Sequence, residues 1–268
     1  ALPICLMSPY DALKNENKAG KIGDLISPFL YPIEKYILKY SDLILTDTQL
    51  NREFFINTFY VNHNKIKAIY VGANEDLNFY DNKINNKDNL QVIFYGSFLP
   101  LHGMDVILQA IHRLRDKPIH FTLIGGKGNS LKQFEKTKKA LGLQRITHIK
   151  WVEFSELCRR YIAKTDIFLG GPFGGTGQAQ RVITGKTFQG LAMAKATIIG
   201  KIKEPVGFKD KVNCLMVEQN NSEQLANAIL WAYEHRDKLE NIGQHGWHLY
   251  QNKFSVTHIA KTLNEILL

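Results

Sequence analysis

The chain has 268 residues, 44% of them hydrophobic, which is enough for one large or two medium globular domains with true cores. Its formal net charge of +9 lies mostly after residue 92, so anionic ligands or surfaces are favoured there. The sequence has no basic run with interleaved aromatic residues, no zinc-finger spacing and no recognition-module signature, and we therefore expect no nucleic-acid partner.

The N-terminal run Ala1–Met7 is apolar, but it is too short for a membrane span and lacks the basic region of a signal peptide. There is no initiator Met, and we expect a protein truncated at its N-terminus. The three cysteines, at positions 5, 158 and 214, are far apart and lie in apolar contexts. This pattern favours buried thiols in a reducing cytoplasm over a disulfide or a metal site.

Strands and helices are predicted to alternate in the first third of the chain. Short apolar runs predict strands at 2–8, 43–46 and 66–71. A polar loop is expected over 9–23, and helices are expected over 28–40, with Ser27 as N-cap, and over 48–59, capped by Asp47-Thr48. This order is typical of the last part of a doubly wound parallel sheet that lacks its first half.

The predicted helix over 28–40 carries apolar residues on one face and two lysines, Lys35 and Lys39, on another. Such a helix suits either a solvated face or a peripheral contact with an anionic membrane at the inner membrane face, and both alternatives stay open.

The second part of the chain repeats the alternation over a longer stretch. Strands are expected at 90–95, 119–125, 146–152, 166–170, 196–200 and 213–217. Helices are expected near 103–115, 129–142, 155–164, 185–195, 222–236, 237–250 and 255–267, with Ser155, Ser222 and Ser255 as N-caps. A second, complete doubly wound domain is the interpretation that fits this rhythm.

Residues 74–89 are rich in Asn and Asp and show neither apolar period, which predicts a linker. The expected organisation is therefore a first, incomplete domain at 1–73, the linker at 74–89 and a second domain at 90–250. Residues 251–268 form a C-terminal helix, for which a return to the first domain stays open.

Ligands of doubly wound folds collect at the carboxyl ends of the strands. The loops expected there are Gly96–Gly103, Gly125–Gly128, Trp151–Ser155 and Gly170–Gly185. The first of them joins a strand to the helix near 103–115, whose N-terminal amides suit a phosphate, although any βα turn would read similarly.

Four rival site classes fit poorly. Thr184–Thr187 is similar to the end of a P-loop, but the glycine that such a loop needs is replaced by Gln180, and β-branched residues follow. A G-x-G-x-x-G fingerprint with a following acidic residue is absent, as are a nucleophile elbow and a metal-ligand spacing.

An ordered series of segments is more specific than any single motif. It comprises GSFLPLHG at 96–103, TLIGG at 122–126, Trp151-Val152, DIFLG at 166–170, GKTFQGLAMA at 185–194 and VNCLMV at 212–217. In sequence and order this series resembles the donor domain of family 4 glycosyltransferases of the GT-B fold. The first third, including SDLILTDT at 41–48, resembles the back half of their acceptor domain.

The resemblance implies an α/β protein with two Rossmann-like domains facing a cleft. It implies a hexosyltransferase-type enzyme that moves a sugar from a nucleoside-diphosphate sugar to a glycan, polysaccharide or lipid-linked acceptor with retention of configuration, in the cytoplasm. Neither a metal nor a further cofactor is expected. The implied catalytic residues are Asp11, His102 and Lys186. The implied substrate-binding residues are Gly96, Ser97, Gly103, Gly125, Gly126, Trp151, Val152, Arg181, Thr187 and Gln189.

The chain departs from the family pattern at four of these positions. Ser97 and His102 stand where the family commonly has Arg and Lys, and the two family glutamates fall on Arg181 and Gln189. The departures imply either weaker binding of the diphosphate or a substitute cation, for which Lys186 and Arg181 are the candidates. Two alternatives stay open: a nucleotide-sugar-binding GT-B protein without transfer activity, and a GT-B sugar-nucleotide epimerase.

Overall fold

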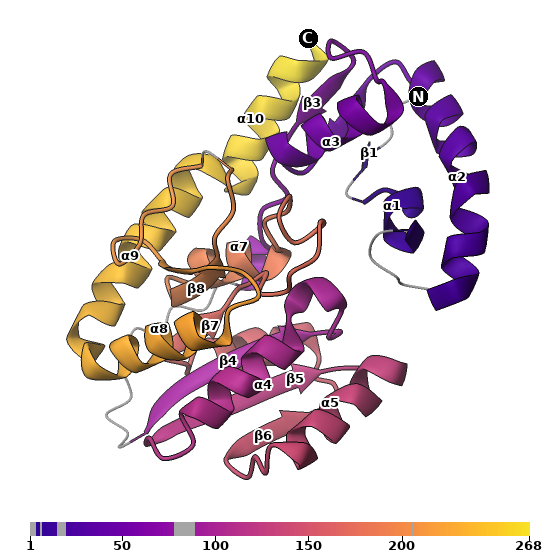
Figure 1. Ribbon diagram of the computed structural model, residues 1–268. Coiled ribbons are helices and arrows are strands. Elements are labelled where there is room, and N and C mark those ends of the chain that lie inside the picture. The colour runs from indigo at the N-terminus through magenta and orange to yellow at the C-terminus, as the bar shows by residue number, and fades with distance from the viewer. Residues whose placement is uncertain (1–3, 6, 15–19, 78–88, 205) are drawn as a thin grey trace.

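The computed structural model describes residues 4–5, 7–14, 20–77, 89–204 and 206–268, which form two parallel α/β units (Figure 1). The strand predicted over 2–8 lies partly outside these residues, and the linker predicted over 74–89 lies mostly outside them. The smaller sheet occupies the upper right of Figure 1 and the larger sheet lies below it.

The smaller unit is a parallel sheet in the order β1-β2-β3. Its elements are β1 (Ile4–Cys5), α1 (Pro9–Lys14), α2 (Gly20–Tyr40), β2 (Ile44–Thr46), α3 (Gln49–Phe59) and β3 (Ile66–Ala68). The strands predicted at 43–46 and 66–71 and the second helix are confirmed, while β1 accounts for residues 4–5 of the strand predicted at 2–8. The Thr48 side chain accepts a hydrogen bond from Asn51 N as the N-cap. The buried cluster beneath the sheet joins α2 and α3 through Leu38, Phe55 and Phe59.

Two predictions in this unit are wrong. The expected loop over 9–23 contains α1, and α2 begins at Gly20 rather than at Pro28, which lies inside the helix. A proline within a helix leaves the carbonyl four residues earlier without its N–H partner. Here the Ser27 hydroxyl donates to that carbonyl, Asp24 O, at 3.3 Å, so Ser27 supports the helix from within instead of capping it.

The larger unit is a six-stranded parallel sheet in the order β6-β5-β4-β7-β8-β9. Its strands are β4 (Leu90–Gly96), β5 (Ile119–Gly125), β6 (Ile146–Ile149), β7 (Ile167–Leu169), β8 (Ala196–Gly200) and β9 (Leu215–Val217). In chain order this is the doubly wound arrangement in which the topology reverses between the first and fourth strands, β4 and β7. A crevice for ligands is therefore expected where these two strands end.

The helices of the larger unit agree with the predicted segments. They are α4 (Met104–Arg113), α5 (Gly128–Ala140), α6 (Phe154–Glu156) with a π-helical turn over Leu157–Ile162, α7 (Gly185–Ala192), α8 (Ser222–Glu234), α9 (Arg236–Lys253) and α10 (Val256–Leu267). Ser255 is confirmed as an N-cap, whereas Ser155 and Ser222 are wrong because Glu153 and Asn221 accept the capping bonds just upstream.

The C-terminal helices α9 and α10 run from the larger sheet toward the smaller one (Figure 1). At their junction the Tyr250 hydroxyl donates to Glu75 Oε1 at 2.8 Å and accepts from Ala73 N at 3.2 Å. Glu75 Oε1 also accepts from Val256 N at 2.8 Å. The junction of the last two helices is thus bonded to the segment that leaves the smaller sheet.

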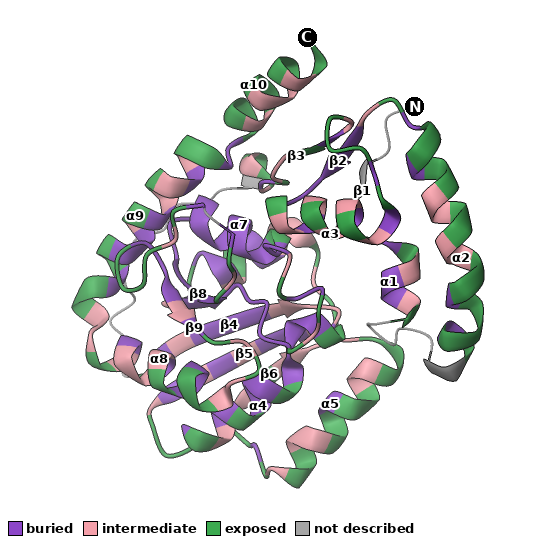
Figure 2. Ribbon diagram, turned by 45° about the horizontal axis from the view of Figure 1, so that its top comes forward, coloured by how far each residue is buried: buried purple, intermediate pink, exposed green. Residues whose placement is uncertain are grey.

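Much of α2 is exposed (Figure 2), and its exposed side chains include an apolar stripe. Its members recur at helical spacing and are Ile22, Leu25, Ile26, Phe29, Ile33, Tyr36, Ile37 and Tyr40. Over the residues that the structure covers, no helix combines the length and apolarity needed to span a bilayer.

Candidate functional site

The ends of β4 and β5 meet through glycines. Gly126 N donates to Gly96 O at 3.0 Å, and a Cβ built on Gly125 would lie 2.0 Å from the same carbonyl oxygen. Gly125 has a φ of 117° and Gly126 a φ of 84°, which are conformations that favour glycine. The sequence thus uses glycine to bring two strand ends together at the carboxyl edge of the sheet.

A cavity of about 500 Å³ opens at this edge, beyond β4, β5 and β6. It is lined by Tyr95, Gly96, Ser97, Ile124, Gly125, Gly126, Lys127, Lys150, Trp151, Val152, Glu153, Phe154 and Leu157. Trp151 is 77% exposed, so its indole is not part of a core. Six of the predicted substrate-binding residues are therefore gathered in one concave, largely apolar site with lysines at its rim.

His102 and Lys186 meet beside this cavity, at the reversal point between β4 and β7. Lys186 Nζ lies 2.9 Å from His102 Nε2, and both side chains are buried. A Cβ on Gly96 would lie 3.1 Å from the imidazole and 3.5 Å from Lys186 Nζ, so the glycine leaves the space that both groups occupy. Two residues 84 positions apart, both assigned to catalysis, form one pair.

The surroundings of Lys186 hold little to stabilise its charge. Nζ also lies 5.3 Å from the centre of the Phe94 ring, and no carboxylate contacts it among the residues that the structure describes. Burial lowers the pKa of Lys186 to about 7. The site therefore suits a ligand that brings its own negative charge.

The loop that enters α7 is held by two threonines. Thr184 is the N-cap, and its hydroxyl donates to Gly170 O at 2.6 Å, while Thr187 Oγ1 donates to Gly171 O at 3.2 Å. Gly103, at the start of α4, leaves room for the same loop, since a Cβ there would lie 2.5 Å from Phe173 C. Thr187 and Gly103 therefore position loops rather than line the cavity.

Asp11 and Arg181 meet between the two units. Arg181 Nη2 donates to Asp11 Oδ2 at 2.5 Å, and the guanidinium carbon lies 4.0 Å from the centre of the Phe54 ring. The Thr48 hydroxyl donates to Arg181 O from the smaller unit. Arg181 is thus occupied by an inter-unit ion pair and lies apart from the Lys186–His102 contact.

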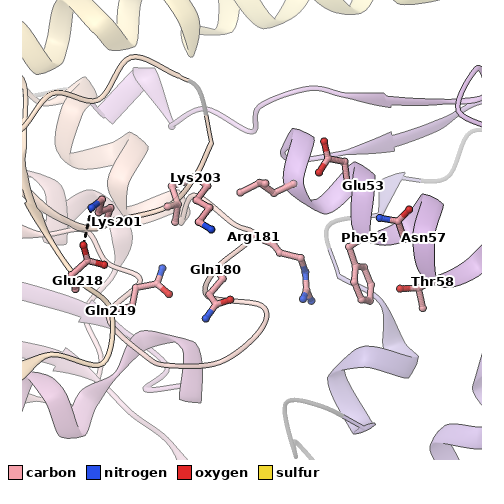
Figure 3. Close-up of a pocket in the computed structure, with 12 residues that line it drawn as sticks. Glu53, Phe54, Asn57, Thr58, Gln180, Arg181, Lys201, Lys203, Glu218 and Gln219 are labelled. Atoms are coloured by element: carbon pink, nitrogen blue, oxygen red, sulfur yellow. Dashed lines mark hydrogen bonds and ion pairs between the residues drawn. The ribbon is translucent and has the colours of Figure 1, made fainter.

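Arg181 also lines a second cavity, of about 640 Å³, between α3 and the ends of β8 and β9. Figure 3 shows Glu53, Phe54, Asn57 and Thr58 on one side and Gln180, Lys201, Lys203, Glu218 and Gln219 on the other. Lys201 and Glu218 form an exposed ion pair at 2.8 Å. The walls are polar and carry both signs of charge.

Gln189 is buried, and its Oε1 accepts from Asn74 N at 3.3 Å, so part of its hydrogen-bonding capacity faces the start of the predicted linker. Sequence reasoning missed Lys150, although its place directly after β6 marks it as a strand-end residue. It also missed Glu204, whose carboxylate accepts from Gln49 N at 2.8 Å and Leu50 N at 3.1 Å. No local pattern around Glu204 signals a contact 155 residues away.

Within the described part of the chain, no cluster of three or more His, Cys, Asp or Glu side chains is placed to hold a metal ion. Cys158 and Cys214 are buried free thiols, as predicted, and the side chain of Cys5 lies outside the described residues.

Two parallel α/β units with a ligand crevice at the strand ends define the GT-B fold, and solved structures agree. Sucrose-phosphate synthase from Thermosynechococcus elongatus has a TM-score of 0.77 at 17% identity, over 99% of this chain and 66% of that chain. HepE of Anabaena, solved in complex with UDP-glucose, has a TM-score of 0.76 at 15% identity, over 99% of this chain and 71% of that chain.

The family follows from the sequence comparisons. Residues 89–235 match the family described as glycosyl transferases group 1, and the chain belongs to that family. An uncharacterized glycosyltransferase of Methanocaldococcus jannaschii is 28% identical over 195 residues, which are 72% of this chain and 50% of that protein. The chain thus spans half the length of this curated relative.

Proposed function

We propose that the protein is a family 4-like, hexosyltransferase-type glycosyltransferase that moves a sugar from a nucleoside-diphosphate sugar to an acceptor with retention of configuration. The observation that carries the proposal is the buried Lys186–His102 pair at the reversal point of a doubly wound sheet, with no carboxylate in contact with Lys186 among the described residues. A buried cation without a carboxylate is costly unless a ligand supplies the negative charge.

The donor would lie along the carboxyl edge of the larger sheet. The 500 Å³ cavity next to Trp151 suits the nucleoside, and Lys186 suits the diphosphate. The N-terminal amides of α4 and α7 begin on the two sides of the reversal point and add partial positive charge. That HepE is solved with UDP-glucose supports a nucleotide sugar as donor.

The chemistry that this site favours is departure of a nucleoside diphosphate. Negative charge develops on the leaving phosphate oxygen, and fixed donors in a water-poor crevice stabilise it. Lys186 and His102 are placed for this role at the larger sheet. Asp11 belongs to the smaller unit, which would present the acceptor, and its ion pair with Arg181 places the carboxylate at the junction of the two units.

A glycan or lipid-linked acceptor completes the proposal. The exposed apolar stripe on α2, with Lys39 exposed beside it, supports a peripheral contact with an anionic membrane that carries such a lipid. Sedimentation with phosphatidylglycerol-containing vesicles tests this contact. Substitution of Phe29 and Ile33 by Ser should abolish sedimentation, and unchanged sedimentation would contradict the contact.

A binding protein without transfer activity remains the second candidate, because Ser97 stands where the family pattern has a cation. Calorimetric titration with UDP, GDP and ADP, beside the matching nucleosides, tests the shared site. We expect binding that needs the diphosphate, and no binding of any of them would contradict both candidates. Acceptor-dependent release of nucleoside diphosphate from the sugar donor then separates transfer from binding.

A further inference from the structure

The hydrogen bonds of His102 determine which imidazole nitrogen carries the proton and whether Lys186 Nζ can be an ammonium. His102 Nδ1 accepts a hydrogen bond from Leu99 N at 3.2 Å. A neutral imidazole has one donor and one acceptor nitrogen, so its proton belongs on Nε2. Nε2 then donates toward Lys186 Nζ, 2.9 Å away. An ammonium has no lone pair to accept that bond, whereas a neutral amine has one.

The groups around Lys186 favour the neutral amine. Lys186 Nζ lies near the Phe94 ring and Gly96, both on β4. The 3-10 turn at Pro100–His102 contributes His102. Lys186 itself lies at the start of α7, which is the positive end of that helix dipole. His102 is the one titratable side chain that contacts Nζ within the described residues. Arg181 and Asp11 neutralise each other elsewhere, and Lys127 and Lys150 are exposed at the rim of the cavity.

We propose that Lys186 is a neutral amine bonded to His102 in the free protein, and that binding of a nucleoside diphosphate takes up one proton at this pair. This inference rests on the proposed function, because it assigns the diphosphate to the same site. The proton comes from solvent and converts the amine to an ammonium. The ammonium then donates hydrogen bonds to the phosphate oxygens. His102 Nε2–H, which no longer donates to Lys186 Nζ, donates to the phosphate oxygens as well.

The protonation change makes binding dependent on pH. Burial lowers the pKa of Lys186 to about 7, and the diphosphate raises it again by supplying negative charge. Above pH 7 each further pH unit should therefore weaken diphosphate binding by up to about tenfold. The terminal phosphate of the ligand ionises near pH 6, so at pH 8 the ligand itself contributes almost no proton change.

The test is calorimetric titration of the protein with UDP at pH 8.0 in buffers that differ in ionisation enthalpy, with GDP and ADP used if UDP does not bind. The slope of the observed enthalpy against the buffer enthalpy gives the number of protons taken up. We expect a value close to one for the native chain. Lys186→Arg keeps a permanent charge, so it should bind with an uptake near zero and with an affinity that is constant between pH 7 and 9.

Lys136→Met is the matched control, because Lys136 is exposed on α5, away from the cavity. Its uptake should equal that of the native chain. Lys186→Met, checked for folding by circular dichroism, should lose the uptake and bind more weakly. Diphosphate binding by the native chain without proton uptake, or an uptake that persists in Lys186→Met, would overturn the inference and leave the proposed function standing. Failure of UDP, GDP and ADP to bind would overturn the proposed function itself.

Discussion

Arg181 of the larger unit and Asp11 of the smaller unit are 170 positions apart and form an ion pair in which Nη2 lies 2.5 Å from Oδ2. The Asp11 side chain is 4% exposed and that of Arg181 is 20% exposed, so solvent screens the pair weakly. The facing Phe54 ring covers the guanidinium. The two units are therefore connected by an ion pair whose two side chains are largely shielded from water.

Removal of one partner from this pair should destabilise the protein more than removal of both. Asp11→Asn and Arg181→Met should each lower the free energy of unfolding by about 2 kcal/mol, because each removes the ion-pair partner of a largely buried charge. A double-mutant cycle measured by urea unfolding should give a coupling of about 1–3 kcal/mol. The exposed pair Lys201–Glu218 is the control, and its coupling should stay below about 1 kcal/mol. Equal couplings for the two pairs would contradict this account.

Glu204 should stabilise α3 from the other unit. Its two carboxylate oxygens accept from Gln49 N and Leu50 N, at the positive end of that helix. Glu204→Gln removes the charge and one acceptor, and we expect a loss of about 1–2 kcal/mol in the free energy of unfolding. Amide hydrogen exchange should quicken at residues 49 and 50. If the free energy of unfolding falls while exchange at residues 49 and 50 is unchanged, the carboxylate does not act by stabilising the start of α3.

Lys186 should make stability depend on pH. Because burial lowers the pKa of Lys186 to about 7, the native chain releases this proton near pH 7, whereas the unfolded chain holds it to about pH 10. Unfolding between these values takes up a proton, so the free energy of unfolding rises with pH in this window. Below pH 7 the full cost of burying the ammonium is present.

Lys186→Met should therefore stabilise the protein most at low pH. We expect a gain of about 3 kcal/mol at pH 6 that shrinks toward pH 9.5, measured by urea unfolding. Lys136→Met should show a small difference that does not vary with pH. A gain from Lys186→Met that is constant across this range would mean that the native amine does not titrate there.

Trp151 should contribute to ligand binding and little to the fold. Its 77% exposure predicts that Trp151→Ala changes the free energy of unfolding by less than about 0.5 kcal/mol. UDP affinity should fall by about tenfold if the indole packs against the nucleoside. Quenching of tryptophan fluorescence by UDP should disappear in the same variant, since the other two tryptophans lie at positions 231 and 247. Undiminished quenching would place the nucleoside elsewhere.

The parts of the fold with strong apolar periodicity could be predicted from the sequence. β5 and β8 match their expected bounds, because each is a short apolar run between clear turn residues. The start of α2 could not be predicted, since the usual reading of Ser27-Pro28 as a helix start ignores that the serine hydroxyl can replace the missing N–H bond at Asp24 O.

The residues of the candidate site that follow the ends of strands could be predicted from the sequence. The contacts between side chains that lie far apart in the sequence could not. Gly96, Gly125 and Trp151 share a cavity because parallel strands end at one edge. The partnership of His102 with Lys186, and of Asp11 with Arg181, joins residues far apart in sequence, and no local period encodes such contacts.

The hydrogen bonds of Tyr250 with Ala73 and Glu75 connect the C-terminal helices to the segment that leaves the smaller sheet, in addition to the contacts that Arg181 and Glu204 make between the units. Ile259 of α10 also lies against Gly72, which follows β3 of the smaller sheet. A chain cut after residue 253 would lose Val256 N as one partner of Glu75 and Ile259 as the neighbour of Gly72, so we expect its smaller unit to be held less firmly against the larger one.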